Sequence, residues 1–264
     1  ASPNKMDFFR RIIKTDPRKM GFQLDLRYFN HHKNVSSMQW LEGEPVIESL
    51  YSEYLVRELG APPRHYEDNM SEFHYEIAAS LQRRLEEIVF DMLNKLQKQT
   101  GMKKLTMAGG VALNCTMNSK ILEQTPFEEL YIQPAAWDGG TSLGSALYVW
   151  HDVLNNPRVQ PMEHAYWGPS FDRNQISEVL EQYTEKISQT GKTVSEHTNS
   201  NEISRITAKD IADGKIIGWF QGKTEFGPRA LGNRSILADP RRHDMREILN
   251  DRIKLRETFR PFAP

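Results

Sequence analysis

The sequence of 264 residues contains one cysteine, Cys115, so it cannot build an internal disulfide framework. It lacks any run approaching the ~18–20 consecutive apolar residues of a membrane-spanning helix, and its first residues contain no apolar block typical of a signal peptide. The single cysteine favours a reducing compartment, and the alternative is a bacterial secreted protein without disulfides. We therefore expect it in the cytoplasm, with no membrane partner.

Charge of one sign is not in excess either. The 34 Lys and Arg residues stand against 35 Asp and Glu, which gives a formal net charge of −1 at pH 7. No bulk positive field therefore attracts nucleic acid, and we expect none as a partner. Any anion must be bound by a local cluster of cations.

Two signatures of catalytic sites are missing as well. There is no Walker A sequence and no HExxH or HxxxH pair, which argues against a P-loop and against a complete zinc site. Cys115 lies in a segment predicted to be helical, and we interpret it as a small buried packing residue rather than a nucleophile.

The strongest helix signal covers residues 70–99. Apolar side chains recur there at three- and four-residue steps, which predicts an amphipathic helix with its charges on the opposite face; they are Ile77, Leu81, Leu85, Ile88, Met92 and Leu96. Residues 46–58 are also predicted to be helical. Residues 22–28 alternate between apolar and polar side chains, which predicts a strand with one buried face.

Strand and helix patterns then alternate through glycine turns. The strands LTMA (105–108) and ELYIQP (129–134) each lead to a glycine pair and a predicted helix, VALNCTMNSKIL after the first pair and residues 141–151 after the second. This alternation predicts an α/β layer with a crossover helix. Residues 153–169, rich in Asn, Pro and Gly, are the predicted boundary.

A second α/β unit is expected beyond that boundary. Its predicted strands are IIGWF (216–220) and SILA (235–238), and its predicted helices cover residues 175–185, 202–213 and 243–254.

The two glycine pairs follow strands, where a backbone can approach a ligand and a helix offers free N–H groups to a phosphate. Asp138 stands at the mouth of the second turn, where a carboxylate can hold a cation that bridges phosphate oxygens. The alternatives are a tight turn without a ligand and, for Asp138 or Thr141, a helix N-cap.

The most unusual stretch is GWFQGKTEFGPRALGNRSILADPR, residues 218–241. It places Lys223, Arg229 and Arg234 among glycines, with Glu225 and Asn233 between them. Arginine matches phosphate oxygens in pairs, and each charge-assisted bond contributes roughly 1.5–3 kcal/mol. The alternative is a solvated loop whose surface ion pairs are worth ~0–1 kcal/mol each.

These segments, in order from FQLDLRYF to the final RETFRPFAP, resemble the carbamoyltransferase family that includes nodulation protein U and the antibiotic O-carbamoyltransferases. The resemblance implies an α/β protein with a partial ASKHA (ribonuclease H-like) domain, similar to the tRNA-threonylcarbamoyl transferase fold, over residues 1–160. A partial YrdC-like domain is implied for residues 161–264. The sequence is then expected to be an interior piece of a longer protein, whose other parts supply histidine metal ligands and the base for the acceptor.

The resemblance also implies a reaction. Carbamoyl phosphate and ATP form a carbamoyl adenylate, and the carbamoyl group passes to the hydroxyl of a small-molecule acceptor. The expected cofactors are ATP and a divalent metal, Fe or Mg, and a homodimer is compatible with the family.

Site residues follow by position. The implied catalytic residues are Lys223, Arg229 and Arg234, and the implied metal ligand is Asp138. The implied ligand-binding residues are Gly109, Gly110, Asn114, Gly139, Gly140, Glu225, Asn233 and Ser235.

Two other functions compete with this one. An ASKHA-type small-molecule kinase explains both glycine turns but not the dense loop around Arg229. A tRNA-associated binding module is suggested by relatives of both domain types, but the neutral charge argues against it.

Overall fold

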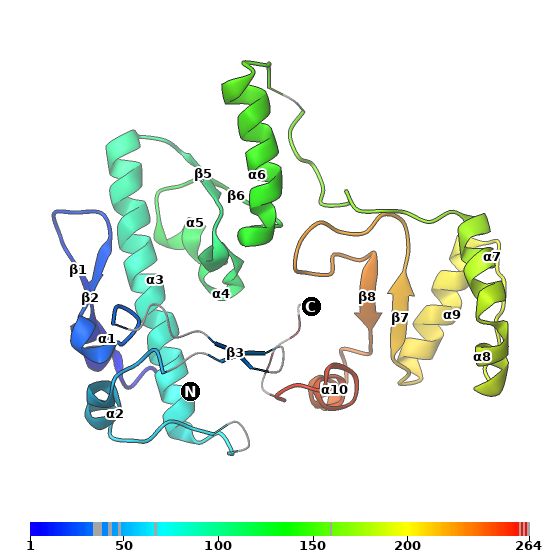
Figure 1. Cartoon of the computed structure of the whole chain (residues 1–264), viewed down its shortest axis with the longest axis horizontal. Coiled ribbons are helices and arrows are strands. Elements are labelled where there is room, and N and C mark those ends of the chain that lie inside the picture. The colour runs from blue at the N-terminus through cyan, green and yellow to red at the C-terminus, as the bar shows by residue number, and fades with distance from the viewer. Residues whose placement is uncertain are drawn as a thin grey trace. The chain divides into compact units, whose positions relative to one another are not determined.

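The computed structural model describes residues 1–33, 39–41, 44–46, 49–65, 68–158, 160–258, 260 and 262 (Figure 1). The chain divides into two compact units, Ala1–Gln133 and Pro134–Pro264, and each is a mixture of helices and small sheets, as expected for an α/β class. No helix in the described part of the chain is both long and apolar enough to cross a bilayer.

The elements of the first unit are α1 Met6–Ile12, β1 Ile13–Thr15, β2 Phe22–Leu24, β3 Gln39–Leu41, β4 Glu44–Val46, α2 Glu53–Leu59, α3 Glu72–Thr100, β5 Lys104–Met107, α4 Cys115–Asn118, α5 Ile121–Gln124 and β6 Glu129–Ile132. Those of the second are α6 Thr141–Tyr148, α7 Arg173–Gln182, α8 Thr184–Gln189, α9 Ser200–Ala212, β7 Ile217–Phe220, β8 Arg234–Leu237 and α10 Met245–Ile248.

Helix α3 confirms the strongest helix prediction made from the sequence. Its C-terminal half contributes Phe90 and Leu93 to a core with β5, α4 and α5. The predicted separation of charge from the core is wrong, because Arg84 and Glu86 are buried, whereas Leu81 is 45% exposed. Arg84 donates to the carbonyl of Ile13 at 2.6 and 3.0 Å, so a polar contact with β1 replaces apolar packing on that face.

Strands β5 and β6 pair in parallel, which confirms the predicted crossover. The predicted continuous helix between them is wrong. A 3₁₀ turn, Gly110–Leu113, is followed by the short helices α4 and α5, because Asn114 leaves the helical conformation and caps α4 through its side chain. Cys115 is exposed, so the prediction of a buried packing residue is wrong.

Two shorter predictions also need correction. Strand β2 ends at Leu24, since Asp25 caps a 3₁₀ turn over Leu26–Tyr28, and Phe22 is exposed. The helix predicted for residues 46–58 begins only at Glu53, after a Ser52 cap, while Val46 belongs to β4. Residues 47 and 48 of that prediction lie outside the described residues.

The second unit contains the antiparallel pair β7–β8, in which Phe220 faces Arg234 and Ile217 faces Leu237. Helix α9 precedes β7 and contacts it, as Figure 1 shows. The helix predicted for residues 175–185 is divided into α7 and α8, and the one predicted for residues 243–254 is α10 continued by a π-helical turn over Leu249–Lys254.

Candidate functional site

The charged loop, residues 221–233, joins β7 to β8 and contains four of the twelve candidates from the sequence, Lys223, Glu225, Arg229 and Asn233, while Arg234 and Ser235 follow in β8. Glu225 lies at its centre and is 9% exposed. Its Oε1 accepts three backbone N–H groups, from Leu231 at 2.9 Å, Asn233 at 2.7 Å and Arg234 at 3.2 Å. Burial raises the pKa of a carboxyl, but these hydrogen bonds outweigh it, so the pKa of Glu225 is lowered. The carboxylate therefore fixes the returning half of the loop.

Arg234 is engaged with the loop itself. Its Nη1 donates to the carbonyls of Gln221 at 2.6 Å and Asn233 at 2.8 Å, and its Nη2 donates to Gly222 at 3.2 Å. The guanidinium carbon lies 3.5 Å from the ring centroid of Phe220, a cation–π contact. Both Nη atoms thus donate to backbone carbonyls of the loop. The contact of Arg234 with a ligand stays a prediction.

Lys223 and Arg229 present a different environment, because both residues are exposed. The backbone of Lys223 is held by the amide of Asn233, which donates to its carbonyl at 2.7 Å, while its ammonium makes no hydrogen bond or ion pair with the described residues. Ser235 lies in β8 opposite Trp219. An oxyanion at the surface of the charged loop can reach the ammonium of Lys223 without breaking the hydrogen bonds described above.

A segment that the sequence analysis treated as a boundary supports the other side of the loop. Thr224 accepts from the N–H of Gly168 at 2.9 Å and donates to Pro169 at 3.0 Å, and Phe226 donates to Ala165 at 2.6 Å. These backbone hydrogen bonds are not accompanied by a regular spacing of apolar residues in the sequence. The Pro and Gly content of the segment therefore predicted a domain boundary instead. Residues 165–169 are therefore part of the site's framework.

The Asp138 turn, Asp138–Gly140, and the charged loop both pack against Pro134 and Ala135. A Cβ on Gly140 would overlap the carbonyl oxygen of Ala135, and a Cβ on Gly227 would lie 3.0 Å from the carbonyl oxygen of Pro134. These glycines are needed for close packing within the protein. The second glycine pair therefore forms a tight turn of the chain, and its role in ligand binding stays a prediction.

The carboxylate of Asp138 is exposed and does not cap α6. The backbone carbonyl of Asp138 accepts the Thr141 hydroxyl at 2.6 Å. No group of three His, Cys, Asp or Glu side chains in the described ranges could hold a metal ion. The described residues alone thus do not form a metal site around Asp138.

Residues 140–144, GTSLG, follow the G-x-S-x-G pattern of a hydrolase nucleophile, a signal that the sequence analysis missed. Ser142 lies in the first turn of α6, and its hydroxyl donates to the carbonyl of Gly139 at 3.1 Å. Among the described residues no histidine bonds to it, so the base that activates a nucleophilic serine is not in place.

The glycine turn, residues 109–114, belongs to the first unit. The space where Gly109 and Gly110 would carry a Cβ contains no atom within 4 Å, so a ligand can approach the backbone. Asn114 Oδ1 accepts the N–H of Met117 at 3.0 Å. Close by in sequence, Asn118 Oδ1 is the one buried side-chain polar atom of the described residues without a hydrogen-bond partner. An open glycine backbone and an unpaired acceptor fit a ligand with hydrogen-bond donors.

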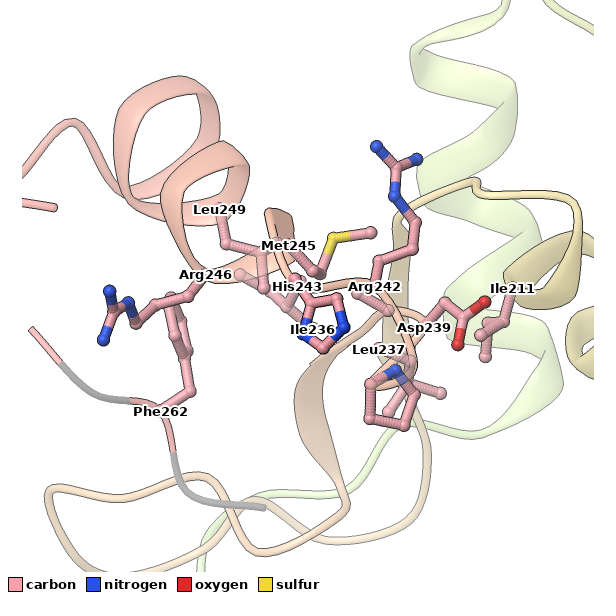
Figure 2. A pocket seen from close by; sticks show the side chains of 12 residues that line it. Ile211, Ile236, Leu237, Asp239, Arg242, His243, Met245, Arg246, Leu249 and Phe262 are labelled. Atoms are coloured by element: carbon pink, nitrogen blue, oxygen red, sulfur yellow. The ribbon is translucent and has the colours of Figure 1, made fainter.

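A cavity of about 680 Å³ lies at the C-terminal end of β8 (Figure 2). Its lining is mostly apolar, with Ile211, Ile236 and Met245 among the side chains shown. Asp239 in its wall is paired with Arg241, which holds the pKa of that carboxyl at about 2. None of the site residues that were predicted from the sequence lines this cavity.

Comparison with known families identifies the class of protein. Residues 7–147 match the family model described as carbamoyltransferase N-terminus, and residues 208–264 match the one described as carbamoyltransferase C-terminus. The first match alone covers more than half of the chain, so the protein belongs to the carbamoyltransferase family.

Individual relatives agree with this assignment. The chain is 43% identical over 192 residues to nodulation protein NolO of Bradyrhizobium diazoefficiens, a match that covers 72% of this chain and 34% of the relative. It is 32% identical over 191 residues to 3'-hydroxymethylcephem-O-carbamoyltransferase of Amycolatopsis lactamdurans, covering 72% and 33%. An uncharacterized protein of Synechocystis is 36% identical over 247 residues, covering 92% and 37%. The chain thus spans about a third of the length of these relatives.

The predicted domain boundary at residue 160 falls between the two family matches, which leave residues 148–207 unassigned. The contacts within the structure divide the chain after Gln133 instead. The division into residues 1–160 and 161–264 stays a prediction.

Proposed function

We propose that the protein is an ATP-dependent O-carbamoyltransferase. Carbamoyl phosphate, water and ATP give a carbamoyl adenylate, phosphate and pyrophosphate, and the carbamoyl group is then transferred to the hydroxyl of a small-molecule acceptor with release of AMP. The observation that carries the proposal is the ordered match of both carbamoyltransferase models, together with a relative whose printed name is that of an O-carbamoyltransferase.

In this proposal the charged loop serves adenylate formation, within a domain similar to YrdC. Water releases phosphate from carbamoyl phosphate, an oxygen of the resulting carbamate forms a bond to the α-phosphorus of ATP, the bond from that phosphorus to the bridging oxygen of the β-phosphate breaks, and pyrophosphate leaves. Fixed cations offset the repulsion between the two anions. Lys223 and Arg229 are the exposed cations of the loop and take this role. Glu225 and Arg234 hold the loop in shape through the backbone contacts described above.

The transfer step belongs to an ASKHA-like domain. The acceptor oxygen forms a bond to the carbamoyl carbon, the bond from that carbon to the adenylate oxygen breaks, and AMP leaves. Gly109, Gly110 and Asn114 are proposed to bind the nucleotide during this step, which agrees with the open space over the two glycines. Asp138 is proposed as one ligand of a divalent metal, Fe or Mg. The described residues do not complete that site, so its other ligands must come from elsewhere.

The proposal is tested by separating the two half-reactions in the full-length protein. We expect Arg229→Ala to abolish adenylate formation, measured as ATP–pyrophosphate exchange, while transfer from preformed carbamoyl adenylate remains measurable. Arg205→Ala, an exposed arginine of α9 in the same unit, is the matched control and leaves both half-reactions intact. Survival of both half-reactions in Arg229→Ala contradicts the assignment of the loop.

The acceptor is identified by a screen. The full-length protein is incubated with carbamoyl phosphate, ATP and a panel of hydroxylated metabolites, and products are read by mass spectrometry as a carbamoyl mass increase. A phosphoryl mass increase instead favours the small-molecule kinase. Cytoplasmic location and a homodimer complete the proposal and are checked by fractionation and by light scattering.

A further inference from the structure

Helix α3 carries a buried carboxylate that the proposed function does not use. The side chain of Glu86 is 2% exposed and is linked to the glycine turn through Gln82. A buried carboxylate is retained only with compensating donors, because burial without them is costly. The groups that donate hydrogen bonds to Glu86 therefore indicate which part of the protein this carboxylate positions.

The donors come from two directions. Glu86 Oε1 accepts from Lys120 Nζ at 2.7 Å and from Gln82 Nε2 at 3.0 Å. Gln82 is in turn paired with Asn114 of the glycine turn, accepting from its Nδ2 at 2.8 Å and donating to its Oδ1 at 3.2 Å. These four residues, Gln82, Glu86, Asn114 and Lys120, are the Glu86 cluster.

The cluster has a fixed direction of hydrogen bonding. An ionised carboxylate only accepts, so the NH₂ group of Gln82 must face Glu86 and its Oε1 faces Asn114. Asn114 must then donate through Nδ2, which leaves its Oδ1 for the N–H of Met117, 3.0 Å away. The charge of Glu86 thus sets the orientation of an amide two contacts away, at the N-terminus of α4.

We propose that Glu86 is a positioning residue for the ligand of the glycine turn and acts through Gln82 and Asn114. The inference rests on the proposed function, in which this turn binds the nucleotide of the carbamoyl donor. Glu86 itself touches no ligand. It fixes the turn in the conformation that leaves the two glycines open, at the start of the segment that ends in the unpaired Asn118 Oδ1.

The adjacent residue on α3 provides a matched control. Glu87 is also a carboxylate with cationic partners, but it pairs with Arg84 at 2.8 Å and with Arg10 of α1, away from the glycine turn. Glu87→Gln therefore tests the loss of a charge on α3 without touching the Glu86 cluster.

The first experiment needs no ligand. Amide hydrogen exchange is measured by mass spectrometry in Glu86→Gln, Glu87→Gln and the parent protein. We expect exchange of residues 110–118 to accelerate about tenfold in Glu86→Gln and to stay within about twofold in Glu87→Gln, with α3 unchanged in its C-terminal half. Unchanged exchange in Glu86→Gln overturns the proposal. Equal acceleration along the whole of α3 also overturns it, because Glu86 then only stabilises the helix.

The second experiment uses ATP and the transfer half-reaction of the full-length protein. Glu86→Gln is expected to raise the KM of the nucleotide-bearing substrate about tenfold and to leave kcat at saturation within about twofold, since positioning affects the ligand before it affects chemistry. Gln82→Ala, which removes the relay and keeps the buried charge, should give the same split. Loosening of the turn without a change in KM overturns the positioning role.

The two experiments separate this inference from the function on which it rests. If the parent protein neither binds ATP nor transfers a carbamoyl group, the proposed function fails, and with it the positioning role. Accelerated exchange in Glu86→Gln then still measures the coupling between α3 and the turn.

Discussion

The charged loop and the glycine turn are both candidate ligand sites, but their shapes are fixed in opposite ways. The returning half of the charged loop is held by nearby residues, with Glu225 accepting backbone N–H groups six to nine positions ahead and Arg234 donating to carbonyls up to thirteen positions behind, while residues 165–169 hold its other half. The glycine turn is held from a distance, because Asn114 bonds to Gln82, which is 32 positions earlier in α3.

This difference shows what a density of charge in a sequence means. Lys223, Glu225, Arg229 and Arg234 look equivalent along the chain, yet Glu225 and Arg234 bind the backbone of the loop. Lys223 and Arg229 are exposed. Two of these four charged residues, Glu225 and Arg234, therefore hold the backbone of the loop, a role that a pattern of charge in the sequence does not distinguish from that of Lys223. In the glycine turn the corresponding charge, Glu86, lies outside the turn altogether.

The largest expected effect is at the centre of the charged loop. Glu225→Ala leaves three backbone N–H groups without an acceptor, and we expect the free energy of unfolding of the second unit to fall by about 2–3 kcal/mol. Urea titration followed by tryptophan fluorescence measures it, since Trp219 lies in β7 beside the loop. Glu225→Gln retains an acceptor oxygen and should lose less. Equal stability of all three proteins contradicts a loop held from within.

A second comparison uses one glycine from each site. Gly227 has a φ of +153° and faces the carbonyl oxygen of Pro134, so Gly227→Ala strains the backbone and should lower the free energy of unfolding by about 2 kcal/mol. Gly110→Ala meets no neighbour and should stay within about 0.5 kcal/mol of the parent. Thermal unfolding checks both. A large loss in Gly110→Ala would show that the glycine turn is packed rather than open.

The sequence predicts well those elements that depend on local periodicity. Helix α3, the parallel pair β5–β6 and the strands on both sides of the charged loop all follow from the spacing of apolar residues or from glycine turns. What fails depends on individual polar contacts. The expected helix after Gly110 breaks because one amide, Asn114, caps a new helix.

The buried carboxylate shows the same limit within a correctly predicted helix. Glu86 lies in a run of charges that the amphipathic pattern assigns to solvent, but Lys120, 34 residues later, reaches back to it. The regular spacing of apolar residues cannot predict a pair of charges that are 34 residues apart in the sequence. The candidate residues of the charged loop were found from their composition, whereas their division into shape-holding and exposed groups required coordinates.

A smaller effect distinguishes shape from ligand contact at Arg234. Arg234→Lys keeps the charge but loses the planar fork that reaches the carbonyls of Gln221 and Gly222 and stacks on Phe220. We expect the free energy of unfolding to fall by about 1 kcal/mol. Chemical denaturation gives the value, and Arg205→Lys on α9 is the control with no such contacts. Lost adenylate formation at unchanged stability would instead place Arg234 against the ligand.

The smallest effect is a difference in how salt acts on the two buried carboxylates. The pKa values of Glu225 and Glu86 are both lowered, so each contributes stability that is complete above the carboxyl's ordinary pKa and is lost as pH falls through its folded value. Burial opposes ionisation in both, but only Glu86 is compensated by cations, Lys120 and Arg83, in addition to hydrogen bonds.

Raising the ionic strength from about 0.1 to about 1 M shortens the Debye length from about 10 to about 3 Å and screens those half-exposed cations. The acid midpoint for exchange of residues 110–118 should therefore move to higher pH with salt. The midpoint for residues 226–234 should stay, because Glu225 is held by peptide N–H groups. Exchange measured between pH 5 and pH 3 at both ionic strengths, with Glu86→Gln and Glu225→Gln as references, decides the matter. Equal shifts in both segments mean that the two sites are stabilised by the same kind of contact.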